Sequence, residues 1–320
     1  MIRFSWLQFR AQAAVVAGAL ALLAVAAAVL IHRDDGSVRT WLGLLVIVTP
    51  GLIGAFWGAP LVASEFEDGT FRLAWTQSVT RRRWMAVKLV VVGLASMAAA
   101  GLLSLVVTWW ASPLDRGNQF ATFDQRDIAP IGYAAFAFTL GVLAGALIRR
   151  TRPAMFVTLA VFITVRLAEL TWLRPRLLQP VLLNLALNPG STGYGQAGTL
   201  SVLFGSPTLM PNPPDLPNTW ITSTRIVNAH GEGLTTRVLD SACPSINRGR
   251  GGGGLGHTKA PQAVVNALQD CVAKVGTTYH EALAYQPASH YWPLQWYELA
   301  IFLGAALVLA AACLWRIRRG

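Results

Sequence analysis

Charged residues are scarce in this chain. Asp, Glu, Lys and Arg make up only 13% of its 320 residues, whereas 54% are hydrophobic, and the mean hydropathy is +0.47. A soluble globular protein of this size needs more charge on its surface, so this composition excludes that class. The chain is therefore predicted to lie in a lipid bilayer.

Six stretches have few or no charged residues. Each is long enough to cross a hydrocarbon core of about 30 Å, which takes about 20 apolar residues in a helix. They lie near residues 13–31, 41–63, 89–111, 128–148, 153–173 and 293–315. The first could be a signal peptide, but it is longer than a usual signal-peptide core, and we interpret it as a retained span. We expect an all-α polytopic membrane protein with six transmembrane helices.

Basic residues are few on one side of these spans and many on the other. Cytoplasmic loops of membrane proteins are enriched in Lys and Arg, which predicts that both termini are cytoplasmic. The cytoplasmic segments then hold Arg3, Arg10, Arg72, Arg81, Arg82, Arg83, Lys88, Arg149, Arg150, Arg152, Arg316, Arg318 and Arg319, and the short outer loops hold only Arg33, Arg39, Arg116 and Arg126.

This topology predicts the domain organisation. It consists of a cytosolic amphipathic helix over 1–12, a five-span region over 13–173 with a cytosolic loop at 64–88, an extracytoplasmic domain over 174–292, and a sixth span with a basic cytosolic tail over 293–320. The extracytoplasmic domain is a mixed insertion between the fifth and sixth spans. Within it, 219–229 is rich in β-branched residues and predicts a strand, whereas 260–275 has helical periodicity. The apolar segment 177–187 is too short to cross and is interrupted by Pro180, so we expect it at the membrane interface.

Only three cysteines are present, and two of them, Cys243 and Cys271, fall in the predicted outer domain. The predicted helix over 260–275 directs Cys271 towards a small core. An oxidising compartment favours a disulfide between these two cysteines, which would stabilise the domain by about 3 to 4 kcal/mol. The alternative is a pair of free thiols.

Signatures of catalysis are also lacking. Gly249, Gly251 and Gly254 have the spacing of a dinucleotide-binding loop, but no strand and helix are predicted beside them, so a flexible linker is the better interpretation. His280 and Glu281 begin a zinc-protease motif, but Ala284 stands where the second histidine is needed. We predict no catalytic residue and no metal site, and we do not expect this chain to be an enzyme.

Three charged residues interrupt the spans. Arg166 and Glu169 stand three apart in the fifth span, on neighbouring positions of one helix face, and Glu298 lies in the sixth. A charge in hydrocarbon is costly unless it is paired or hydrated. These residues either line a translocation path or form structural ion pairs, with Glu298 as a possible third member.

The loop after the second span has the most informative order of residues. It reads SEFEDGTFRLAWTQSVTRRRWMAVK over residues 64–88, an acidic run and Gly-Thr, then an amphipathic stretch, then a basic cluster. It resembles the loop between the second and third spans of type-2 ATP-binding-cassette exporter permeases, in which an E-x-E-x-G-T run leads into a short coupling helix. The matching residues and their neighbours are Glu65, Glu67, Asp68, Gly69, Thr70, Arg81, Arg82, Arg83 and Lys88. The C-terminal segment 285–315 also resembles that of actinobacterial members.

The resemblance implies a permease whose cytosolic helix docks on a separate ATPase. The sequence contains no G-x-x-x-x-G-K-[ST] phosphate loop, so ATP and Mg²⁺ are expected on the partner ATPase and no cofactor on this chain. Other expected partners are a second permease copy, identical or paralogous, and the lipid bilayer, with no nucleic acid. The preference for Arg over Lys and the abundance of Ala suggest the plasma membrane of a GC-rich bacterium.

Several functions stay open at this stage. The leading one is efflux of an amphipathic or hydrophobic compound, such as a drug-like metabolite or a lipid. The alternatives are a non-transporting sensor or scaffold that works with an ATPase, and a proton-coupled secondary transporter that uses Arg166, Glu169 and Glu298. For the loop alone, the alternative is a basic anchor for anionic headgroups.

Overall fold

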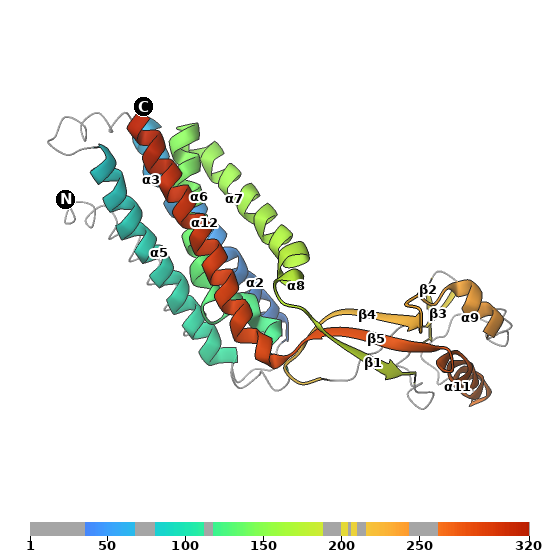
Figure 1. The fold of residues 1–320 in the computed structure, drawn as a ribbon. Coiled ribbons are helices and arrows are strands. Elements are labelled where there is room, and N and C mark those ends of the chain that lie inside the picture. Colours follow the sequence, from blue (N-terminus) through green and yellow to red (C-terminus); the bar gives the residue numbers. More distant parts are fainter. Residues whose placement is uncertain are drawn as a thin grey trace. The chain divides into compact units, whose positions relative to one another are not determined.

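The computed structural model describes residues 36–67, 81–111, 118–187, 200–203, 206–209, 216–242 and 262–319 (Figure 1). The chain divides into two compact units. The helical unit is formed by the segments up to residue 178 and from residue 289 onwards, and the sheet unit by residues 179–288.

Long helices form the helical unit. The elements in chain order are α2 (Gly36–Ile53), the π-helix η1 (Gly54–Gly58), α3 (Ala59–Glu67), α5 (Arg81–Ala111), the 3₁₀ helix η2 (Gln119–Gln125), α6 (Ala129–Ile148), α7 (Thr151–Ala168), the π-helix η3 (Glu169–Leu173), α8 (Arg174–Leu177), the 3₁₀ helix η6 (Ala288–His290) and α12 (Tyr291–Arg319). In the described part of the chain, 5 helical segments are long and apolar enough to cross a membrane, namely Val46–Glu67, Arg83–Trp109, Gln119–Ile148, Thr151–Leu177 and Ala288–Arg316. They coincide with five of the predicted spans. The predicted first span and the predicted N-terminal helix lie outside the described residues.

Helix α6 occupies the centre of the helical unit and contacts α2, α3, α5, α7 and α12 (Figure 1). Its apolar core includes Phe138 and Val142, which are buried against Ile53 of α2, Met85 of α5 and Cys313 of α12. The helix ends at Arg149, whose left-handed backbone (φ 58°) directs its N–H to the carbonyl of Gly145. The chain then turns directly into α7, where Pro153 fits the first helical turn because its missing N–H would have no partner there.

The second span contains two prolines, Pro50 and Pro60. Helical structure continues past both of them, and the π-helix η1 lies between them. A π-turn accommodates a local change in hydrogen bonding without ending the helix. Glycines here allow close approach to α6: a Cβ at Gly54 would lie 2.4 Å from the carbonyl oxygen of Ala137, and one at Gly141 would lie 2.1 Å from that of Gly54.

The sheet unit contains a three-stranded antiparallel sheet in the order β1–β5–β4, formed by Val181–Ala186, Tyr279–Gln286 and Trp220–Asn228. A second sheet pairs β2 (Leu200–Leu203) with β3 (Ser206–Leu209), and two helices, α9 (Thr236–Ala242) and α11 (Gln262–Gly276), complete the described elements. Strand β4 and helix α11 confirm the predictions for residues 219–229 and 260–275. Strand β5 was missed, and β1 shows that residues 181–186 of the short apolar segment are paired in a sheet.

Helix α11 presents Cys271, Val272 and Val275 to a small core that also contains Ile226 of β4 and Leu239 of α9. The predicted orientation of Cys271 is therefore confirmed, and its side chain is buried. Its predicted partner Cys243 lies outside the described residues, so the disulfide stays a prediction. The glycine-rich segment with Gly249, Gly251 and Gly254 also lies outside them.

Candidate functional site

The first polar site joins the two ends of the predicted coupling loop, and we call it the loop base. Glu65, near the end of α3, accepts a hydrogen bond from the ammonium group of Lys88 in α5. Lys88 is buried, and its Nζ atom lies 4.3 Å from the centre of the Trp84 ring. A buried ammonium group needs such partners because transfer out of water is costly. The pair ties α3 to α5 on the two sides of residues 68–80.

Glu67 has a different partner. Its Oε2 atom accepts hydrogen bonds from the backbone N–H of Thr151, at 3.1 Å, and from the Thr151 hydroxyl, at 2.8 Å. Thr151 begins α7, whose N-cap residue Arg150 provides no side-chain hydrogen bond of its own. A carboxylate at a helix N-terminus is favoured by the unpaired N–H groups and by the helix dipole. Glu67 therefore caps α7 from another helix and adds α7 to the loop base.

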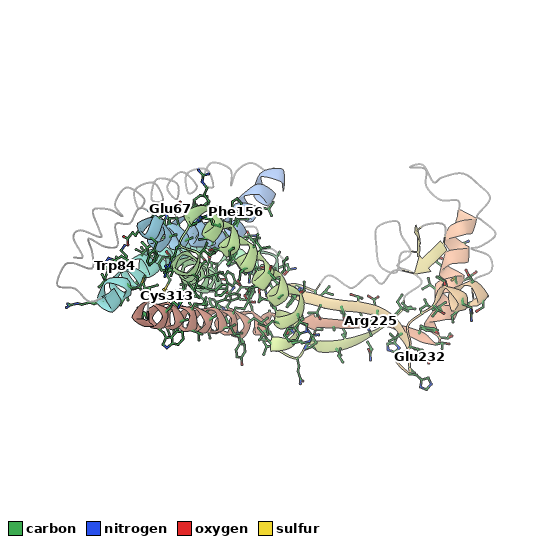
Figure 2. The ribbon with its side chains drawn as sticks, turned by 90° about the horizontal axis from the view of Figure 1, so that it is seen from above. Glu67, Trp84, Phe156, Arg225, Glu232 and Cys313 are labelled. Atoms are coloured by element: carbon green, nitrogen blue, oxygen red, sulfur yellow. The ribbon has the colours of Figure 1, made fainter. Side chains whose placement is uncertain are left out.

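The remaining residues of the predicted coupling set lie at the start of α5 or outside the described residues. Arg81 and Arg82 lie in the first turn of α5, and the Arg83 side chain is exposed. Asp68, Gly69 and Thr70 lie outside the described residues. The structure thus brings Glu65 together with Lys88 but directs Glu67 to Thr151, which the sequence analysis did not single out. Figure 2 shows Glu67, Trp84 and Cys313 at the same end of the helical unit.

The second polar site lies at the other end of α6, near its first turns, and we call it the polar cluster. It is formed by side chains from η2, α6, α7, η3, α8 and α12. Its members are Asp124, Tyr133, Arg166, Glu169, Arg174 and Glu298.

Two arginines connect the acidic members. Arg166 pairs with Glu169 one turn further along and donates to Asp124 at 2.8 Å. Arg174 contacts all three acids: its Nε atom lies 3.0 Å from Glu169, its Nη2 atom lies 3.1 Å from Glu298, and it also pairs with Asp124. The hydroxyl group of Tyr133 donates a hydrogen bond to the carboxyl group of Glu298. The sequence-predicted residues Arg166, Glu169 and Glu298 therefore share one network.

Aromatic rings shield this network. The Arg166 guanidinium lies 3.8 Å from the centre of the Tyr133 ring, and that of Arg174 lies 4.6 Å from the centre of the Phe123 ring. The Glu298 side chain is 0% exposed and that of Glu169 3%, whereas Asp124 retains 22%. Contacts with ring faces favour cations most where water is excluded. The polar cluster is consequently a buried, mutually paired group of charges.

Asp124 and Arg174 were missed as members of this cluster. Both lie just outside the predicted cores of the spans, next to the end that carries Glu169. The sequence could have indicated both residues by their position. They lie at the same ends of their spans as Glu169, and charged residues at the same depth of a helix bundle can pair. In the described part of the chain, no group of three His, Cys, Asp or Glu side chains could hold a metal ion. His280 and Glu281 lie on strand β5, not on the helix that a zinc-protease motif requires.

Comparison with known proteins identifies a family for part of the chain. Residues 31–174 match the family described as ABC-2 membrane transporter related. The matched range includes the whole loop base and every member of the polar cluster except Glu298. No curated protein and no solved structure shows a significant match. Residues 31–174 are thus similar to ABC-2 membrane transporter proteins, and the resemblance of this chain to type-2 ATP-binding-cassette permeases is confirmed.

Proposed function

We propose that this chain is the transmembrane permease subunit of an ATP-binding-cassette exporter in the plasma membrane of a bacterium. Separate ATPase subunits bind ATP and Mg²⁺, and the permease converts their closure into efflux of an amphipathic or hydrophobic compound, such as a drug-like metabolite or a lipid. The family match and the apolar helices support the permease assignment. ATP coupling, outward direction and cargo are our proposals.

The loop base is the observation that carries the coupling proposal. A force applied to residues 68–80 by a docked ATPase reaches α3 and α5 together, because Glu65 and Lys88 hold the two helices at that point. It also reaches α7 through the hydrogen bonds between Glu67 and Thr151. Coupling between distant sites travels through packed side chains, ion pairs and rigid elements of this kind. In this proposal, Glu65 and Glu67 position the loop and do not themselves contact the ATPase.

The experiment is a reconstitution of the chain with an ATP-binding-cassette ATPase that co-purifies with it from native membranes. Substrate-stimulated ATP hydrolysis and efflux would be measured for wild type, E65Q, K88M and the charge-swapped double variant E65K/K88E. We expect both single variants to lose stimulation several-fold while the ATPase still binds, and the swapped pair to recover part of it because the ion pair is restored. R176Q, an exposed change near the polar cluster, is the matched control.

Two results would oppose this proposal. Unchanged coupling in E65Q and K88M would show that the loop base does not transmit force. Intact ATPase binding with no transport of any compound by wild type would favour the sensor or scaffold.

We further propose that two permease copies assemble with two ATPases, as the resemblance implies. The second copy is identical or paralogous. Chemical cross-linking of differently tagged copies in native membranes tests this point, and a single tag in every cross-linked product would argue against a homodimer.

We assign the polar cluster to structure and not to a translocation path. Each of its charged groups is engaged with an opposite charge, and Arg166, Glu169, Arg174 and Glu298 are each less than 10% exposed. A group that binds a passing substrate needs an open side. Efflux that follows a pH gradient without nucleotide would oppose this assignment and favour a secondary transporter.

A further inference from the structure

The polar cluster contains one more acid than base. Its carboxyl groups belong to Asp124, Glu169 and Glu298, and its guanidinium groups to Arg166 and Arg174. If all five groups were ionised, the cluster would carry one uncompensated negative charge. No member of this cluster offers a third cation to balance it.

The other charged residues nearby have their own partners. On the segment after η2, Arg126 pairs with Asp127 at 3.2 Å, and Asp127 also accepts a hydrogen bond from Tyr291 of α12. On α8, Arg176 donates to the backbone carbonyl of Trp172 at 2.7 Å in an exposed position. Arg126 and Asp127 together carry no net charge, so this pair leaves the charge balance of the polar cluster unchanged, and Arg176 is exposed to solvent.

Two of the three acids converge on one hydrogen atom. Glu169 and Glu298 both accept from the Nε atom of Arg174, which has a single N–H bond. The two carboxyl groups are therefore held beside each other at this nitrogen atom. Two ionised carboxylates offer only acceptor atoms and repel each other, and a proton on one of them removes this repulsion.

Burial determines whether Glu169 and Glu298 can both be ionised. The Glu169 and Glu298 side chains are 3% and 0% exposed, so water cannot screen an excess charge on them. An uncompensated charge has an unfavourable free energy in a buried site. Two adjacent carboxyl groups avoid this charge when they retain one proton between them. We propose that the polar cluster is a proton-binding site, in which Glu169 and Glu298 share one proton at neutral pH.

The shared proton makes the polar cluster electrically neutral. Two guanidinium groups then face two negative charges, one on Asp124 and one shared by Glu169 and Glu298. The shared proton explains how Glu169 of η3 and Glu298 of α12 can lie close together. Both residues belong to segments that are expected to cross a membrane. The inference does not depend on ATP coupling, because it follows from the charges and contacts of the cluster alone.

Infrared spectroscopy tests the proposal directly. The purified full chain in lipid nanodiscs at neutral pH is expected to show the carbonyl-stretch band of a protonated carboxylic acid, which shifts when H₂O is replaced by D₂O. E169Q and E298Q are each expected to lose this band, because either change removes the excess acid and the need for a proton. E65Q is the matched control: Glu65 is balanced one-to-one by Lys88, and its replacement should leave the band unchanged.

Several results would overturn the proposal. Absence of the band in wild type would mean that all three acids are ionised, and this outcome needs no variant. A band retained in both E169Q and E298Q would place the proton elsewhere, and loss in only one of them would exclude a shared position. The thermal unfolding midpoint of each variant shows whether its fold is intact, and if one variant fails to fold, wild type and the other variant still decide.

Discussion

Arg174 binds all three carboxyl groups of the polar cluster, whereas Arg176, two residues later, is exposed and binds a backbone carbonyl. The planar guanidinium group has five N–H donors, and in Arg174 its nitrogen atoms contact Asp124, Glu169 and Glu298. The two arginines of the short helix α8 are therefore expected to contribute very differently to the free energy of unfolding. The difference comes from burial, since exposed pairs contribute little and a broken buried pair leaves uncompensated charge.

Replacement of Arg174 tests this contrast. R174Q should lower the free energy of unfolding by about 3 to 5 kcal/mol, because the buried Glu169 and Glu298 and the partly exposed Asp124 lose a shared cation. R176Q should change it by less than about 0.5 kcal/mol, as is usual for a surface substitution. Denaturant unfolding in detergent micelles, followed by Trp fluorescence, measures both variants. Equal stability of the two would contradict the structural role of the cluster.

The predicted disulfide also belongs to the residue scale. Cys271 is buried in the core of the sheet unit, and we expect it to be linked to Cys243. Mass spectrometry of peptides from the non-reduced protein should recover the two cysteines in one linked peptide. C243S should then destabilise the sheet unit by about 3 to 4 kcal/mol. Alkylation of both cysteines without a reductant would show that they are free.

At the scale of elements, glycines determine how closely η1 and α3 approach α6. A Cβ at Gly141 would meet the carbonyl oxygen of Gly54 at 2.1 Å, and one at Gly145 would meet that of Ala59 at 2.5 Å. Gly141 and Gly145 stand four residues apart on one face of α6. The structure places both glycines in a contact within one chain, where small residues allow backbones to approach.

An alanine substitution tests this packing. G141A should lower the thermal unfolding midpoint, with an expected cost of about 1 to 3 kcal/mol, because backbone atoms must move to admit the methyl group. G304A in α12 is the control, since a Cβ there has nothing within 4 Å. Alanine is a better helix former than glycine, so G304A should be neutral or slightly stabilising. A midpoint for G141A at or above that of G304A would contradict the close approach.

At the scale of the whole molecule, the predicted topology places α7's first turn in the cytosol and the sheet unit outside. His230 lies in an exposed turn of the sheet unit, and Arg152 is exposed in the first turn of α7. A membrane-impermeant maleimide should label H230C in intact cells but R152C only after the membrane is permeabilised, with wild type as the background. The opposite pattern would reverse the orientation.

The organisation of the spans was largely predictable. The described helices coincide with five apolar stretches, because a helix that crosses a bilayer needs a fixed length of apolar sequence and this requirement is local. The pairing of Arg166 with Glu169 is local as well, since residues three apart are neighbours on a helix. Strand β5 was less predictable, because a short strand depends on its pairing with β1 and β4.

The amino-acid sequence by itself determined that the chain has long apolar helices, a charged loop between two of them and a family resemblance carried by that loop. Only the tertiary structure decided which partner each charge takes. Glu65 binds Lys88 across the loop, Glu67 caps a helix that begins 84 residues later, and Arg174 meets Glu298 across 124 residues. The physical reason is that such partners are chosen by which helices pack together, and no local pattern specifies that choice.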